Sequence, residues 1–138
     1  MAEVLKTWWP NNGVVVEIID ESMETSKDAW MIKLAVKGTI EVKTKYVADF
    51  EDDPDYLEIL SMVLPRAEYR RDIVKAGVKA DKVAAEKVFL LNAFEKEALV
   101  YFERDDFPER YVRKLYKELE KRLSAKRAIR KNDSDEFQ

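Results

Sequence analysis

The sequence predicts an α+β fold, an N-terminal three-stranded antiparallel β-meander followed by three to four α-helices, the last long and amphipathic. Between positions 14 and 46 apolar and polar residues alternate, which is the period of half-buried strands. After position 53 apolar residues recur every three to four positions, as on one face of a helix. A chain of 138 residues, 46% hydrophobic and 38% charged, suits one folded domain. We expect this domain over residues 1–131, ahead of a flexible acidic tail at residues 132–138.

The first strand is predicted over residues 14–19, where the apolar side chains of Val14, Val16 and Ile18 fall on one face. Residues 20–28 are mostly polar and show no such alternation, so a loop is expected there. The meander therefore begins with a strand that has one buried face.

The second and third strands are predicted to form a hairpin. Residues 29–37 alternate strictly, and the apolar positions on one face are Trp30, Ile32, Leu34 and Val36. Lys37-Gly38 interrupts this pattern and predicts a turn, after which residues 39–46 alternate again. The resulting sheet has two free edges, and one of them could pair with a second copy of the chain.

Two short helices, or one kinked helix, are expected next. Asp53 fits an N-cap that is followed by Pro54 at the first helical position. Pro65 lacks a backbone donor and should interrupt the helix, and Gly77 is suited to a C-cap. The start lies in an acidic run, which is favourable at the positive end of a helix dipole. The run consists of Asp49, Glu51, Asp52, Asp53, Asp55 and Glu58.

A further helix is predicted over residues 79–97, where alanine and larger apolar residues recur at helical spacing on more than one face. We expect it to be the most buried helix. The apolar run at residues 98–102 fits either a continuation of this helix or a short strand, because so short a run does not define a period.

The last helix has the best-marked start. In Asp106-Phe107-Pro108-Glu109 the aspartate and the glutamate stand three positions apart, as in a capping box. On a helical wheel one arc is apolar and consists of Tyr111, Val112, Leu115, Tyr116, Leu119 and Leu123. The opposite side, which we call the basic arc, consists of Arg110, Arg113, Lys114, Lys117 and Lys121. The apolar arc is expected to pack on the core.

The composition excludes several classes of function. The chain has neither cysteine nor histidine, which rules out disulfide frameworks, serine–histidine or cysteine–histidine catalysis and histidine-ligated zinc. The N-terminus lacks the basic and apolar regions of a secretory signal. The longest apolar run is also far shorter than the ~20 residues of a membrane span. We therefore expect a cytoplasmic protein, not bound to a membrane and without a cofactor.

The first functional interpretation is a small binding or regulatory protein without enzymatic activity. The basic arc would contact an acidic surface, either of a protein or of a nucleic acid. Alternatively, this arc is only the solvated face of a surface helix. Trp8 and Trp9 would form a hydrophobic flap over the sheet or, if exposed, an anchor for a partner or a second copy. A structural subunit of a larger assembly, with the basic arc against an acidic neighbour, is a further alternative.

A different alternative is an enzyme. Glu41-Val42-Lys43 resembles the Glu-x-Lys strand of PD-(D/E)xK nucleases, and Asp28 stands upstream of it. The resemblance covers a short part of the chain. It implies a magnesium ion held by Asp28 and Glu41, with Lys43 positioning or activating the attacking water. The same residues also fit the solvated face of an amphipathic strand, where Glu41 and Lys43 are neighbours of opposite charge.

Overall fold

The computed structural model describes the backbone of residues 2–136 and the side chains of residues 2–130. Residue contacts divide the chain into two compact units. What we call the sheet unit combines Met1–Glu41 with Glu68–Phe107, and what we call the helical unit combines Val42–Ala67 with Pro108–Gln138.

The predicted combination of an antiparallel sheet with helices, the last of them long, is confirmed. The predicted number of strands is wrong, because the sheet has five strands and not three. The single domain expected over residues 1–131 stays a prediction. The side chains of the expected tail, residues 132–138, lie outside the described part of the chain.

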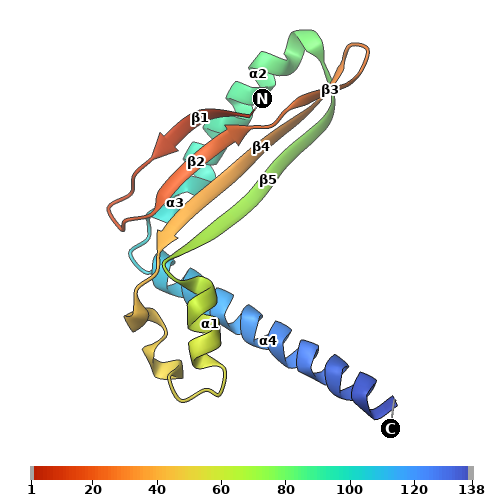
Figure 1. The fold of residues 1–138 in the computed structure, drawn as a ribbon. Helices are drawn as coiled ribbons and strands as arrows, with labels where there is room; N and C mark the ends of the chain where they lie inside the picture. Colours follow the sequence, from red (N-terminus) through yellow and green to blue (C-terminus); the bar gives the residue numbers. More distant parts are fainter. Residues whose placement is uncertain (1, 137–138) are drawn as a thin grey trace. The chain divides into compact units, whose positions relative to one another are not determined.

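The long strand β4 organises the sheet (Figure 1). The strands are β1 (Glu3–Trp8), β2 (Val15–Asp20), β3 (Met23–Ser26), β4 (Ala29–Glu41) and β5 (Arg66–Lys79). β2 and then β3 pair antiparallel with successive parts of β4, and β5 pairs with its other side. β1 pairs antiparallel with β2. Among the described strands, β1, β3 and β5 therefore each have one unpaired edge.

The predicted hairpin turn at Lys37-Gly38 is wrong, because β4 continues without a break to Glu41. The separate third strand expected over residues 39–46 does not exist. Its first part is the end of β4, and its last part is the short 3₁₀ turn η1 (Thr44–Tyr46).

Gly38 lies inside β4 beside an aromatic ring and does not form a turn. Val36 and Ile40 on either side of it are both buried, so the alternation of β4 passes through the glycine in phase. A Cβ atom at Gly38 would lie 3.4 Å from the Cβ of Tyr69 and 3.5 Å from the Cε1 of Phe102. A larger side chain would have to displace the Phe102 ring.

Two short strands lie where none was predicted. β1 precedes the expected first strand, and its alternation is interrupted by an irregularity between Val4 and Lys6. β3 lies inside the expected loop over residues 20–28, and all four of its residues are exposed. Neither strand therefore shows the two-residue hydrophobic period that identifies a strand with one buried face.

The helix predicted after Pro65 and ending at Gly77 is also wrong, because this segment is β5. The Leu64–Pro65 peptide bond is cis, and Gly77 has a positive φ of 68° inside the strand. The side chains that face the helices are Tyr69, Arg71 and Ile73, and those that form ion pairs on the other face are Glu68, Arg70 and Asp72. Charged residues on both faces conceal the two-residue period from a hydrophobicity pattern.

A helical layer covers one face of the sheet (Figure 1). It consists of α2 (Val83–Ala93), the π-helical turn η4 (Phe94–Ala98) and α3 (Leu99–Glu103), after the short 3₁₀ turn η3 (Ala80–Lys82). The apolar run over residues 98–102 is thus helical. The expectation that the helix over residues 79–97 is the most buried is wrong, because α2 contains no buried residue. The layer packs with one side only, and Phe89 of α2 remains 65% exposed.

Ion pairs connect this layer to the sheet. Lys6 of β1 contacts Glu95 of η4 at 2.9 Å, and Lys75 of β5 pairs with Glu86 of α2. Lys87 of α2 contacts Asp20 of β2 at 2.6 Å. Partial burial raises the pKa of Asp20, but the hydrogen bonds from Lys87 and Ser22 outweigh it and hold the pKa below its ordinary value.

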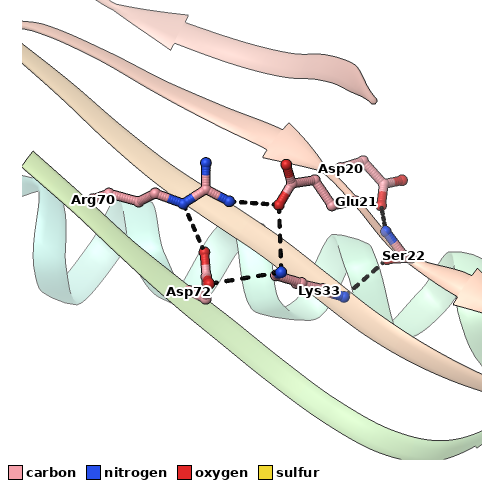
Figure 2. A network of polar contacts seen from close by, with 6 residues as sticks. All are labelled: Asp20, Glu21, Ser22, Lys33, Arg70 and Asp72. Atoms are coloured by element: carbon pink, nitrogen blue, oxygen red, sulfur yellow. Dashed lines mark hydrogen bonds and ion pairs between the residues drawn. The ribbon is translucent and has the colours of Figure 1, made fainter. Parts of the chain in front are cut away.

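The other face of the sheet carries a closed ring of four charged side chains (Figure 2). Arg70 contacts Glu21 at 2.7 Å and Asp72 at 3.4 Å. Lys33 contacts Glu21 at 3.7 Å and Asp72 at 3.8 Å. These side chains are half-exposed, so each pair contributes little to stability. The ring balances charge across the strands and leaves no free cation in this group of four.

In the helical unit, α4 (Phe107–Glu136) packs on the segment that follows β4. This segment contains η1, the 3₁₀ turn η2 (Ala48–Phe50) and α1 (Tyr56–Val63). The predicted apolar arc of the last helix is the packed side, and its members Val112 and Tyr116 are fully buried. Within the described residues, no helix is both long and apolar enough to cross a bilayer.

The predicted N-cap at Asp53 is wrong, because α1 begins at Tyr56 with Asp55 in the capping position. Asp53 instead accepts a hydrogen bond from the Tyr116 hydroxyl at 3.1 Å. The Tyr116 ring stacks on Phe50 with 4.6 Å between the centroids. The acidic run therefore supplies a tertiary contact to the last helix.

Candidate functional site

The sheet unit contains a pocket between the helical layer and strands β4 and β5, with a volume of about 400 Å³. The sheet contributes Val36, Tyr69, Arg71 and Ile73, and the helices contribute Leu90, Ala93, Phe94, Glu97, Ala98, Tyr101 and Phe102, together with Phe107. All of these residues except Arg71 and Glu97 are apolar or aromatic. The pocket is therefore an apolar hollow with one cationic and one anionic side chain.

Local backbone geometry explains how these residues come together. The alternation of β5 turns every second side chain toward the helices. In η4 the Leu99 amide donates to the carbonyl oxygen of Phe94, five residues earlier, so the helix is wider by one residue in this turn. The widened turn places Phe94, Glu97 and Ala98 together in the pocket lining. Such π-helical turns frequently occur at functional sites.

The end of the helical layer is fixed by Asn12, in the loop between β1 and β2. Its amide nitrogen donates to the carbonyl oxygen of Phe102 at 2.6 Å and to that of Arg104 at 2.7 Å. These bonds satisfy carbonyl groups that a helix end leaves without an intrahelical partner. Its side-chain oxygen accepts from the amide of Val14 at 3.1 Å. Asn12 thus holds the segment that carries Phe102 against the start of β2.

Aromatic rings form the inner wall of the pocket. The Phe102 ring lies 5.1 Å from the rings of both Tyr69 and Phe107, with edge-to-face geometry in each case. Phe94 lies 6.1 Å from Phe102 on the other side. Edge-to-face pairs at this spacing are favourable and hold ring orientations. The wall is therefore formed before any ligand binds.

Arg71 and Glu97 are exposed residues at this apolar pocket. Of the side chains that the structure describes, none forms an ion pair with either of them. This contrasts with the opposite face of the sheet, where Arg70 and Asp72 are both paired. The pocket therefore holds two opposite charges that are available to a ligand.

The basic arc was expected to face an acidic partner, and part of it has one inside the helical unit. Arg113 donates to both carboxylate oxygens of Asp49, at 2.7 and 2.9 Å, and to the carbonyl oxygen of Tyr46 at 3.0 Å. The hydrogen bond from Arg113 lowers the pKa of Asp49. Lys117 lies 4.4 Å from the centre of the Phe50 ring. Arg113 and Lys117 are thus engaged in packing.

Arg127, further along α4, repeats this arrangement. It donates to Asp55 at 3.0 Å and lies 3.6 Å from Glu58. Arg110, Lys114 and Lys121 of the basic arc are exposed. The acidic run and the last helix therefore neutralise each other in part, and the exposed remainder of the arc is smaller than the sequence pattern indicates.

Trp8 and Trp9 have different environments. Trp8 is the last residue of β1, and its ring packs 5.4 Å from that of Phe94. Trp9 is 73% exposed in the loop after β1. Of these two tryptophans, only Trp9 is exposed enough to act as an anchor for a partner or a second copy.

The residues of the nuclease alternative do not converge. Asp28 lies in the turn before β4, and Glu41 is the last residue of that strand. Thirteen extended residues at ~3.3 Å each separate their ends by about 40 Å. Asp28 and Glu41 therefore cannot hold one magnesium ion, and the alternative with Lys43 as the activating residue loses its metal site. No group of three or more carboxylates suited to a metal ion is found within the described residues.

Comparison with known proteins adds no assignment. No family model, no curated protein and no solved structure matches the chain. Evidence for the function therefore comes from the pocket of the sheet unit and from the basic arc. Sequence reasoning missed the pocket, although the alternation of Tyr69, Arg71 and Ile73 was a signal that could have indicated one wall of it.

Proposed function

We propose that the protein is a small non-enzymatic binding protein and that the pocket of the sheet unit is its main ligand site. The observation that carries this proposal is the pocket itself, at about 400 Å³. Sites for small molecules have volumes of about 300–1,000 Å³, a mostly apolar lining and a few polar groups that fix orientation. The pocket has all three properties.

Binding without catalysis is supported by the chemistry of the lining. The lining residues that the structure describes include a single carboxylate, Glu97, and neither serine nor threonine. A nucleophile activated by an adjacent base is the usual requirement for covalent catalysis. The described lining offers no such pair, and the chain has no histidine to act as a base near neutral pH.

Replacing Ala93 by leucine is expected to weaken binding of a neutral aromatic probe, 3-phenylpropan-1-ol, by at least about tenfold, because the larger side chain occupies the pocket. Leucine is a good helix former, so α2 should be preserved. Affinity is measured by NMR titration. Ala84→Leu is the matched control, since Ala84 is an exposed residue of the same helix outside the pocket lining. Equal probe affinity of the Ala93→Leu protein and the wild type, or no binding to the wild type, would contradict the proposal.

A second candidate function uses the exposed part of the basic arc. We propose that Lys114 and Lys121 contribute to contact with an acidic macromolecule, either a nucleic acid or a protein. Both side chains are exposed, and a separation of seven residues places them on the same side of α4. A structural subunit in a larger assembly would use the same surface. Trp9 or the edge strand β1 would be the contact in a homodimer.

Binding to the single-stranded oligonucleotide dT20 is expected to weaken steeply as salt increases. The double variant Lys114→Glu/Lys121→Glu should lower the slope of log K against log salt by about 1–2, because each lost phosphate contact removes roughly 0.7 from it. Lys43→Glu/Lys45→Glu is the matched control, since both lysines are exposed in the same unit. If dT20 does not bind at low ionic strength, this surface does not recognise nucleic acid, and an acidic protein remains to be tested.

A further inference from the structure

We infer that the ligand of the pocket is a small aromatic zwitterion, a compound with an aromatic body, a carboxylate and a protonated amine, such as an aromatic amino acid. This inference rests on the proposed function, because it specifies the ligand class of the same pocket. The observation behind it is the presence of two opposite charges, Arg71 and Glu97, in a lining that is otherwise apolar and aromatic.

Arg71 is suited to the carboxylate of such a ligand. A guanidinium group binds a planar carboxylate through two parallel hydrogen bonds, which fixes orientation as well as charge. Arg71 lies on β5 between Tyr69 and Ile73 of the same strand face, so a bound carboxylate would sit beside the aromatic wall. No described carboxylate forms an ion pair with Arg71.

Glu97 is suited to the amine. Among the described residues of the lining it is the only acidic one, and it comes from η4, on the helical side of the pocket opposite β5. The neighbouring acid of that turn, Glu95, is bound by Lys6 at 2.9 Å, whereas no described cation forms an ion pair with Glu97. A simple anion would bind Arg71 but would be repelled by Glu97. A simple cation would bind Glu97 but would be repelled by Arg71. A zwitterion satisfies both charges.

The aromatic wall accounts for the body of the ligand. Phe102, Tyr69 and Phe107 already meet edge to face, which is the arrangement by which a further ring could join them. A volume of about 400 Å³ accommodates one ring system with a short polar end. The shared chemistry of the expected ligands is therefore one aromatic ring with an acid and an amine at the same end.

Four phenyl probes separate the contributions. They are phenylalanine with both charges, 3-phenylpropanoate with the acid, 2-phenylethylamine with the amine, and neutral 3-phenylpropan-1-ol. Phenylalanine is expected to bind the wild-type protein most tightly, by about tenfold over the neutral alcohol. Arg71→Gln should weaken phenylalanine and 3-phenylpropanoate by about tenfold and leave the alcohol within about twofold, and it should bind the amine at least as tightly as the wild type because the repulsion from Arg71 is removed. Glu97→Gln should weaken phenylalanine and 2-phenylethylamine to the same extent and leave the alcohol within about twofold, and it should bind 3-phenylpropanoate at least as tightly as the wild type because the repulsion from Glu97 is removed.

Matched controls come from neighbours that face away or are already paired. Arg70→Gln removes an arginine from the opposite face of β5, and Glu95→Gln removes an acid bound to Lys6, so neither should change the order of the four affinities. If the alcohol binds as tightly as phenylalanine, the zwitterion inference is overturned while the pocket as a binding site stands. If no probe binds the wild-type protein, both this inference and the proposed function fail.

Discussion

Replacing Phe102 by alanine is expected to lower the free energy of unfolding by about 3–5 kcal/mol. The side chain is only 5% exposed, and its ring contacts those of Tyr69, Phe94 and Phe107. Truncation removes these contacts and leaves a cavity beside Gly38. This glycine has no side chain that could fill the cavity. Urea denaturation of the variant and the wild type measures the difference.

The control for this prediction is Val100→Ala. Val100 belongs to the same helix, α3, but is 55% exposed, so its truncation should cost less than about 1 kcal/mol. Phe102→Leu should cost less than Phe102→Ala, since it fills part of the cavity. A Phe102→Ala protein as stable as the Val100→Ala protein would show that the aromatic wall is not packed as described.

The largest expected pH effect belongs to Tyr116. Burial, and then its hydrogen bond to Asp53, raise the pKa of Tyr116 above its ordinary value of about 10. Above pH 10 the unfolded chain therefore loses the tyrosine proton while the folded chain keeps it. Stability contributed by this group is complete below pH 10 and is lost as pH rises, at up to about 1.4 kcal/mol per pH unit. Urea titrations at pH 8 and pH 11 measure the change.

Tyr116→Phe should abolish this part of the alkaline loss. It should also cost about 1–2 kcal/mol at pH 8, because the hydroxyl bond to the Asp53 carboxylate is lost. Tyr101→Phe is the control, since Tyr101 is 60% exposed. If Tyr116→Phe and the wild type lose the same stability between pH 8 and pH 11, the hydroxyl does not keep its proton in the folded state.

Hydrophobic period predicted the elements that have one buried and one solvated side. It identified β2 and most of β4, and it identified the apolar arc of α4 with Val112 and Tyr116 at its centre. In each of these elements the buried side chains are apolar or aromatic, and none is charged. Pattern and burial therefore agree.

The elements that were missed lack this contrast. β3 has no buried residue, and β5 carries charged side chains on both faces because one face forms the ion-pair ring and the other borders the pocket. Gly38 was interpreted as a turn, although it lies inside β4 beside Phe102, which comes from a segment more than sixty positions away. Such a tertiary contact has no local signal in the sequence.

Contacts between distant segments also limited the prediction of the candidate site from the sequence. Arg113 and Lys117 belong to the predicted basic arc, but their contacts with Asp49 and Phe50 depend on packing between distant segments. The run of acids and the arc of bases had opposite charge, which was the one available indication of a contact between them within the chain. The pocket was not predicted, because one wall includes a strand that was predicted as a helix and the other includes a π-helical turn.

The most direct test of the ligand site is a titration of ¹⁵N-labelled protein with 3-phenylpropan-1-ol, followed through backbone amide shifts. We predict that the saturable shifts cluster at residues 69–73 of β5 and 90–102 of the helical layer, and that the same titration of Ala93→Leu loses them. Shifts that do not saturate, or that cluster around Trp9 or along α4 instead, would contradict a ligand site between the sheet and its helices.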